Sequence, residues 1–245
     1  MIDIHSHILP GVDDGAKSWE IAVEMCRMAA ADGVTHMVAT PHANDRYAYD
    51  RAQQEAVLSQ LRARVGAAPE LSLGCDFHLS YDSLQEVLAF PERYTINSSR
   101  YLLVELSDFS IPTQIADCFH RLGDRGVTAV ITHPERNAIL RQSPQRVLEW
   151  VELGCVVQVT ANALTGFWGS GIARSAAWLL EHEAVHVLAS DAHDAQHRVP
   201  ILSRARDLVA QALGTNVAQA LVEENPRAIL AGEPLPYSPK PVLKG

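Results

Sequence analysis

Seven short apolar runs recur along the chain, and each is followed by a polar turn and an amphipathic stretch with helical periodicity. The runs are continuous rather than alternating in polarity, which is typical of parallel strands buried on both faces. This pattern predicts seven βα units with no internal linker, and therefore a single (β/α)7 barrel; a doubly wound open sheet is the alternative. The predicted strands are residues 1–5, 35–40, 70–75, 101–106, 127–132, 155–160 and 184–190.

The length and composition agree with one domain of this kind. The chain has 245 residues, and its hydrophobic content of 47% is enough for a sizeable core. We expect the barrel to occupy residues 1–232. The remaining residues 233–245, EPLPYSPKPVLKG, are rich in proline and predict an extended, partly mobile tail.

The net charge of −9 argues against binding nucleic acid through a general basic surface. No apolar stretch is long enough to cross a bilayer, and the first residues lack a basic segment followed by an apolar one. We therefore expect a cytoplasmic protein with no membrane insertion. The sequence leaves the oligomeric state open.

Imidazole and carboxylate side chains follow almost every predicted strand. In a parallel barrel the C-terminal ends of the strands share one rim, and active sites form there. Residues i and i+2 of a strand point to the same face, so the histidines of the opening H-S-H can present both rings to one point. The rim residues are His5, His7, His42, Asp76, Glu105, His133, Asp191 and His193.

This mixture of histidine and carboxylate groups suits Mn, Fe or Zn. The set exceeds the three or four protein ligands that one catalytic ion takes, so we expect two or three clustered ions. Each motif also has a simpler interpretation: H-x-H as a structural pair, HPER as a turn with a surface ion pair, and SDAH as a helix N-cap. Of the other histidines, His78 stays open, His186 is expected to pack inside the last strand, and four are expected to be structural or exposed: His36, His120, His182 and His197.

Two other phosphate chemistries are excluded by the sequence. A cysteine phosphatase needs an arginine six positions after its thiol, but the residues at that spacing are Asp32, Tyr81, Asp124 and Ala161. The four cysteines form no C-x-x-C pair and are expected to be buried free thiols. No P-loop motif occurs either.

The ordered set MIDIHSH…VDDG, TPH, HPER and SDAH resembles the PHP superfamily, named for polymerase and histidinol phosphatase. The segments GCDF, RYLLVEL, HPERN and ENPRAIL resemble its bacterial branch of manganese-dependent protein tyrosine phosphatases. Members of this branch partner the tyrosine kinases that control capsule and exopolysaccharide synthesis. The resemblance extends from Met1 to about Leu230.

This resemblance implies a distorted (β/α)7 barrel with three metal ions, manganese being expected and Fe, Zn or Mg the alternatives. Arg136 and Arg198 match the phosphate-binding arginines of the family. The family usually has glutamate where this chain has Asp76, which puts the geometry of that bridging ligand in question. The implied ligands are His5, His7, Asp76 and Asp191 for the first ion, Asp76, Glu105 and His133 for the second, and Asp14, His42 and His193 for the third.

The implied activity is hydrolysis of phosphotyrosine in a protein substrate, such as the tail of a bacterial tyrosine kinase. A hydroxide that bridges two ions would attack phosphorus in line, while the ions and both arginines neutralise the growing charge. Segments 43–50 and 161–170 are aromatic enough to flank the phenyl ring, with surface packing as the alternative.

Three other functions stay open at this point. One is a different PHP phosphoesterase such as histidinol phosphatase, and another is a non-catalytic metal-dependent binding module. The third is an amidohydrolase, many of which bridge their metals with a carboxylated lysine on a barrel strand. The only lysines here, Lys17, Lys240 and Lys244, are not on such a strand.

Overall fold

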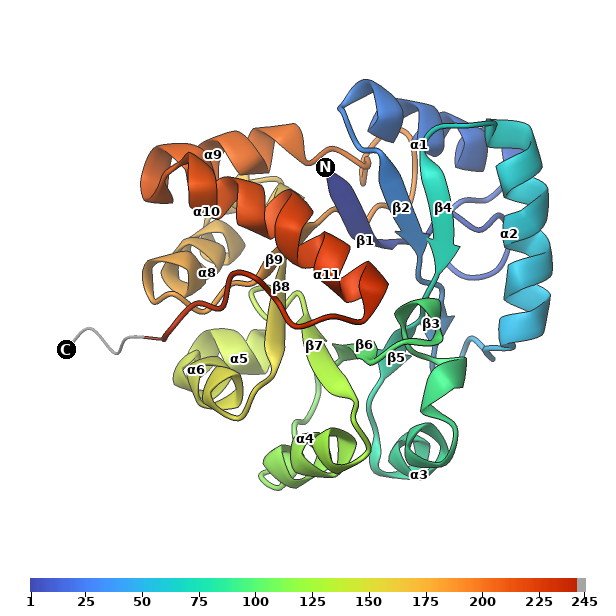
Figure 1. Cartoon of the computed structure of the whole chain (residues 1–245). Helices are drawn as coiled ribbons and strands as arrows, with labels where there is room; N and C mark the ends of the chain where they lie inside the picture. Colours follow the sequence, from blue (N-terminus) through green and yellow to red (C-terminus); the bar gives the residue numbers. More distant parts are fainter. Residues whose placement is uncertain (242–245) are drawn as a thin grey trace.

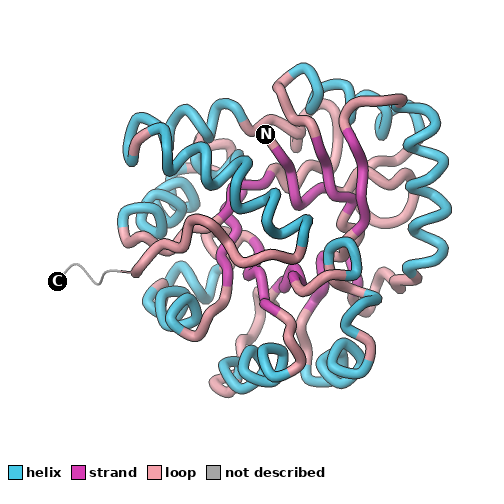
Figure 2. The backbone as a smooth tube through the Cα atoms, in the orientation of Figure 1, coloured by secondary structure: helices cyan, strands magenta, loops and turns pink. Residues whose placement is uncertain are grey.

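The computed structural model describes residues 1–241, with only the backbone described at residues 81 and 82. Short strands lie at the centre and helices surround them (Figures 1 and 2). The strands are β1 (Ile2–Ser6), β2 (His36–Ala39), β3 (His42–Ala43), β4 (Glu70–Leu73), β5 (Asp76–His78), β6 (Tyr101–Glu105), β7 (Thr128–Thr132), β8 (Val156–Thr160) and β9 (Val187–Ala189).

One or more helices follow each strand path. They are α1 (Trp19–Ala31), α2 (Arg51–Val65), α3 (Tyr81–Ala89), α4 (Ile115–Asp124), α5 (Ala138–Gln142), α6 (Gln145–Glu152), α7 (Ala161–Leu164), α8 (Ser170–Glu181), α9 (Ser203–Leu213), α10 (Thr215–Gln219) and α11 (Asn225–Ala231). Two 3₁₀ turns, η1 (Pro91–Arg93) and η2 (Ile96–Ser98), precede β6, and a π-helical turn, η3 (Ala220–Glu224), joins α10 to α11. None of the described helices is long and apolar enough to cross a membrane.

All strand pairs are parallel. The order is β1-β2-β4 in one sheet and β3-β5-β6-β7-β8-β9 in the other. At the far edge the amide of Asp191, just after β9, donates to the carbonyl of His5 at 2.9 Å, and Ser6 forms a parallel bridge with Ala192. The observed fold is thus the predicted distorted (β/α)7 arrangement, in which β9 meets β1 through a narrow contact.

The sequence predicts one strand over residues 35–40 and one over residues 70–75. In the structure each of these paths consists of two short strands. Pro41 has no N–H to continue the ladder, so the second path separates into β2 and β3. The third path divides into β4 and β5 at Gly74, where a Cβ atom would lie 2.9 Å from Cγ1 of Ile96. The last strand is also shorter than predicted, and His186 precedes it rather than lying inside it.

Two apolar clusters hold the layers together. The larger one lies between the strands and the outer helices and includes Met25 of α1 and Leu102 of β6. The smaller one combines residues of β1, β2 and β6–β9, such as Leu103 and Val130, with Ile229 of α11. Helix α11 therefore packs against the N-terminal part of the barrel interior (Figure 1), which leaves the opposite rim to the polar residues.

The segment that follows α11 runs back along the molecule. Asn225 is fully buried, and its Nδ2 donates to the carbonyls of His186 and Tyr237 at 2.9 and 2.7 Å. Its Oδ1 accepts from the amide of Tyr237 at 3.0 Å. Residues 242–245 of the predicted tail lie outside the described residues. The division into a barrel of residues 1–232 and a tail stays a prediction.

Replacing Asn225 with alanine removes three hydrogen bonds at a buried site and leaves two carbonyls without their donor. We expect Asn225→Ala to lower the free energy of unfolding by about 2–3 kcal/mol, measured by urea denaturation. Asn216→Ala, at an exposed position of α10, is the matched control and should change it by less than about 0.5 kcal/mol. Equal stability of the two variants would contradict this account of how the segment is held.

Candidate metal centre

Both histidines of the opening motif point to one place at the end of β1. The register of β1 against β2 shifts between Asp3 and Ser6, so the strand is irregular where it carries His5. The Nε2 atoms of His5 and His7 lie 3.3 Å apart, and both rings are buried. His5 donates from Nδ1 to Oε1 of Gln158 at 2.9 Å, so its Nε2 keeps a free lone pair toward the centre.

Adjacent strand halves place the next two groups side by side. His42 begins β3 and Asp76 begins β5, and the two residues are directly paired in the parallel ladder. Nδ1 of His42 lies 3.3 Å from Oδ2 of Asp76, and Nε2 of His5 approaches the same oxygen at 3.5 Å. Asp76 is fully buried, and its Oδ2 lies between the imidazoles of His5 and His42.

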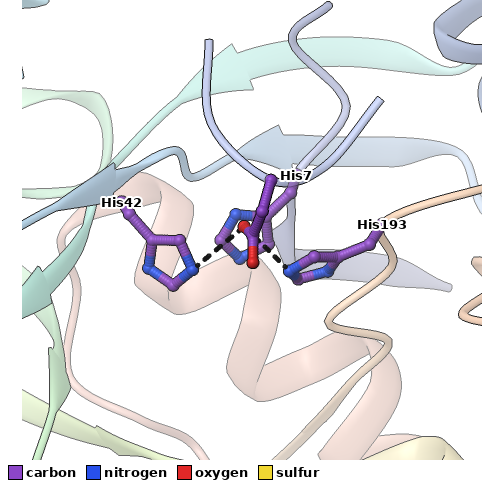
Figure 3. A group of neighbouring side chains, drawn as sticks. His7, His42 and His193 are labelled. Atoms are coloured by element: carbon purple, nitrogen blue, oxygen red, sulfur yellow. Dashed lines mark ion pairs between the residues drawn. The ribbon is translucent and has the colours of Figure 1, made fainter. Parts of the chain in front are cut away.

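The loop after β1 supplies an aspartate that lies between two histidines. Oδ1 of Asp14 lies 3.4 Å from Nε2 of His42 and 3.4 Å from Nε2 of His193. The rings of His7, His42 and His193 gather at this point, with His42 and His193 on either side (Figure 3). His193 donates from Nδ1 to the carbonyl of Asp191 at 3.0 Å, which turns its Nε2 toward Asp14.

Glu105 and His133 complete the set at the ends of β6 and β7. Oε2 of Glu105 lies 3.7 Å from Nδ1 of His42, and its Oε1 lies 3.9 Å from Nε2 of His133. His133 has a φ of 35°, in the left-handed region that is costly for a non-glycine residue. Glu135 fixes this turn, because its buried carboxylate accepts from the amide of Thr160 at 2.9 Å. The surface ion pair considered for HPER is therefore wrong.

Asp191 joins the histidines to the two arginines. Its Oδ1 lies 3.4 Å from Nε2 of His5 and 3.3 Å from Nε2 of His7. Its Oδ2 accepts from Arg136 and from Arg198, the latter at 2.5 Å. Asp191 also has a positive φ, of 49°. One carboxylate thus contacts both halves of the site.

Trp168, in the loop before α8, packs against both arginines. The guanidinium carbon of Arg136 lies 4.7 Å from the centre of one of its rings, and that of Arg198 lies 5.4 Å away. These are cation–π distances, so the indole helps to orient both guanidinium groups. The Nε1 atom of Trp168 is buried and has no hydrogen-bond partner among the described residues.

Several supporting residues were not singled out from the sequence. Asp13 accepts from Nδ1 of His7 at 2.7 Å and from the amide of His42 at 3.1 Å, so it orients two neighbouring imidazole-bearing segments. Asp3 is buried and accepts from the hydroxyl and amide of Ser190, the residue before Asp191. The double aspartate of VDDG was a visible signal for Asp13, whereas Gln158 lies in an apolar run that gave none.

The acidic groups shift the protonation equilibria of the histidines. Burial disfavours a charged His42, but Asp14, Asp76 and Glu105 outweigh it and raise its pKa to about 11. In His7 burial acts the same way, and Asp13 and Asp191 raise the pKa to about 9. Burial, with the charge of neighbouring His7, lowers the pKa of His193 to about 4. The site thus favours positive charge on His7 and His42 and disfavours it on His193.

The donor set fits metal ions. Ligand atoms of a tetrahedral ion bound at about 2.1 Å lie about 3.4 Å from one another, and several donor pairs here are 3.3–3.5 Å apart. Oδ2 of Asp76 and Nδ1 of His42 are buried without a hydrogen-bond partner, which a cation would resolve. The compact donor groups are His7, Asp14, His42 and His193; His5, His7 and Asp76; and His42, Asp76 and Glu105.

These groups differ in part from the predicted ligand sets. The three residues predicted for the third ion occur together, with His7 added. Around Asp76 and Glu105 the third member is His42, whereas His133 is farther from Glu105. The structure therefore gathers the predicted residues on one rim but gives His42 contacts on two sides.

The remaining histidines and the cysteines lie elsewhere, with one exception. His78 is near the site, with Nδ1 3.6 Å from Oε2 of Glu105. His186 is buried and accepts from the amide of Val157. The four cysteines are free; three are buried and Cys118 is partly exposed, which differs from the expectation that all are buried. Burial raises the pKa of the Cys26 and Cys155 thiols to about 12, unsuited to a nucleophile.

The sequence matches one protein family over most of its length. The family is described as "Capsular polysaccharide synthesis, CpsB/CapC", and its model covers residues 1–231. The tyrosine-protein phosphatase CpsB of Streptococcus pneumoniae is 32% identical over 240 residues, covering 94% of this chain and 98% of that protein. The tyrosine-protein phosphatase YwqE of Bacillus subtilis is 30% identical over 233 residues, 91% of this chain and 89% of that protein.

Solved structures agree with the sequence comparison. A structure from a study of YwqE and CpsB, described as unique metal-dependent tyrosine phosphatases, superposes with a TM-score of 0.91 at 30% identity, with all of both chains covered. An organophosphorus hydrolase has a TM-score of 0.61 at 12% identity, covering 94% of this chain and 92% of that one. The second likeness concerns the fold alone.

We expect Asp13→Asn to weaken metal binding although Asp13 does not face the centre. The change removes the carboxylate that orients His7, and loss of such an outer partner costs about 10–100-fold in metal affinity. Isothermal titration of the metal-free protein with Mn²⁺ measures it. Asp117→Asn, at an exposed position of α4, is the control. Unchanged Mn²⁺ affinity in Asp13→Asn would contradict the orienting role.

Proposed function

The chain belongs to the CpsB/CapC family of capsular polysaccharide synthesis, and from this premise we propose that it is a metal-dependent protein tyrosine phosphatase. The observation that carries the proposal is the contact of one carboxylate, that of Asp191, with both the histidine cluster and two arginines. Metal ligands beside a pair of guanidinium groups suit a phosphoryl substrate, since arginine binds phosphoryl oxygens in a bidentate manner.

We assign the metal ligands to the residues predicted from the sequence. His5, His7, Asp76 and Asp191 would hold one ion, and Glu105 and His133 would hold a second one together with Asp76. When bound, the ions would supply Lewis-acid charge neutralisation and a water nucleophile available at neutral pH. The full proposed ligand set is His5, His7, Asp14, His42, Asp76, Glu105, His133, Asp191 and His193.

Arg136 and Arg198 would bind the phosphoryl group. Each guanidinium has five N–H donors, so the contact with Asp191 leaves donors free for a substrate. Arg136 also lines a cavity of about 180 Å³ beside Glu105 and His133. Leu140 and Ile172 form part of its apolar wall, which suits an aromatic ring. The arginines would offset charge that grows on the phosphoryl oxygens during the reaction.

The leaving group places a modest demand on the protein. A phenol has a pKa of about 10, so its anion departs more readily than the alkoxide of serine. The site therefore has no need of a strong general acid. The thiols take no part in this proposal, because no cysteine is followed by an arginine six positions later in the sequence. Burial also raises the pKa of the Cys75 thiol, which directly precedes Asp76.

The physiological substrate we propose is a phosphotyrosine protein, most simply a bacterial tyrosine kinase that regulates capsule or exopolysaccharide synthesis. The family description and the names of the two relatives support this choice. Manganese is the metal we propose, since mixed imidazole and carboxylate sites suit it. The cytoplasmic location stays a prediction.

Three substrates compared side by side in the presence of Mn²⁺ test the function. We expect the protein to release phosphate from a phosphotyrosine peptide and to act poorly on histidinol phosphate and on a non-phosphorylated aryl ester. EDTA should abolish the activity. A preference for histidinol phosphate would indicate another phosphoesterase, and no turnover of any substrate by metal-loaded protein would favour a binding module.

Variants at Arg198 distinguish the loss of phosphate binding from the loss of metal binding. We expect Arg198→Ala to keep its Mn content. Its kcat/KM for a phosphotyrosine peptide should fall by an amount that corresponds to about 2–4 kcal/mol of lost transition-state stabilisation. Arg198→Lys should recover only part, because an ammonium cannot reproduce the planar fork. His7→Ala should instead lose metal. Turnover by Arg198→Ala at the wild-type rate would overturn the assignment of this arginine.

A further inference from the structure

A second cavity lies next to the one beside the metal centre. Its volume is about 490 Å³, and it is formed between α5 and α8. We call it the α5–α8 cavity. Its polar and aromatic lining consists of Arg141, Gln142, Arg174, Ser175 and Trp178.

The two cavities share the same pair of helices. Asn137 and Ile172 line the cavity beside the metal centre, and the residues next to them, Ala138 and Gly171, line the α5–α8 cavity. Each pair of neighbouring residues is separated by one peptide unit, about 3.8 Å between Cα atoms. The linings of the two cavities therefore come within one residue of each other on both helices.

The lining of the α5–α8 cavity carries positive charge, from Arg141 and Arg174. No acidic residue of the described part of the chain lines it, although the whole sequence has a net charge of −9. Among the described residues, neither Arg141 nor Arg174 forms an ion pair or a side-chain hydrogen bond with another residue, and both are exposed. Both guanidinium groups therefore keep their N–H donors free for an anion at this cavity.

In another cavity of the molecule, lining arginines form hydrogen bonds and an ion pair with other residues of the chain. There Arg51 donates to the carbonyls of Arg93 and Thr95, and Arg93 lies 3.8 Å from Glu86. Arg141 has no such partner within residues 1–241 as far as their side chains are described. Instead it extends from α5 toward α8, where its Nη1 would lie 3.5 Å from a Cβ atom on Gly171. Its guanidinium thus lies close to the start of α8.

We propose that the α5–α8 cavity is a second anion subsite, which binds an acidic group of the peptide substrate close to its phosphotyrosine. The inference rests on the proposed phosphatase function and adds the class of substrate sequence that the site prefers. The group is a carboxylate or a second phosphoryl group, since the guanidinium fork matches both. Gln142 and Ser175 offer neutral hydrogen-bond partners beside it.

The subsite acts on substrate binding and not on the reacting bond. It therefore lowers KM for acidic peptides and leaves kcat unchanged. Its arginines are exposed, so the preference is expected to weaken as added salt screens the charges. p-Nitrophenyl phosphate, which has no flanking residues, cannot reach the subsite and reports on the metal centre alone.

The test uses the Mn-loaded full chain and three phosphotyrosine peptides of equal length. One has alanine around the phosphotyrosine, one has glutamate, and one has a second phosphotyrosine. We expect the wild type to prefer an anionic peptide over the alanine peptide by about fivefold in KM, the effect of two exposed charge pairs. The double variant Arg141→Gln/Arg174→Gln should lose this preference and keep its kcat on p-nitrophenyl phosphate. The anionic peptide with the larger loss identifies the natural anion.

The control is Arg100→Gln/Arg125→Gln, which removes the same charge at the N-terminal ends of β6 and β7, opposite the site. If it reduces the preference as much as the first double variant, a general field is responsible and the subsite is wrong. The subsite is also wrong if the wild type hydrolyses all three peptides with equal KM. Failure to hydrolyse any of them would instead refute the proposed phosphatase function.

Discussion

The contacts of the Asp191 carboxylate determine how the rest of the site is arranged. One oxygen faces the histidine pair of β1 at 3.3–3.4 Å, and the other accepts from Arg136 and Arg198. The anion is buried, so it needs positive charge close by to be stable. The fold supplies that charge from two sides, and Trp168 packs against both arginines. The proposed metal ligands and the proposed phosphate-binding arginines are therefore linked through one side chain.

The barrel maintains this carboxylate at a cost in backbone strain. Asp191 and His133 both have positive φ, and such conformations persist where the surroundings fix them. Asp3 supplies part of that support: it binds the hydroxyl and amide of Ser190, while the amide of Asp191 donates to the carbonyl of His5. The segment that carries His5 and His7 thus also fixes the segment that carries Asp191. The contact between β1 and the end of β9 therefore also positions residues of the site.

Much of this could be predicted from the sequence, because polar residues at strand ends share a rim in any parallel barrel. The strand paths and the gathering of His42, Asp76 and Glu105 follow from that rule. What the sequence did not reveal depends on contacts between distant segments. Gln158 lies in an apolar run, and the indole of Trp168 meets Arg136 and Arg198 only in three dimensions. The division of a strand at Pro41, which pairs His42 with Asp76, also needed the register of the sheet.

The central claim is that a cluster of metal ions, rather than a cysteine, makes phosphotyrosine hydrolysis feasible on this rim. Titration of metal-free protein with Mn²⁺ tests it most directly, with bound metal counted by elemental analysis and phosphate release measured on the same samples. Activity is expected to rise only as binding exceeds one ion per chain. Full activity with one ion or fewer, or activity that persists in EDTA, would contradict it.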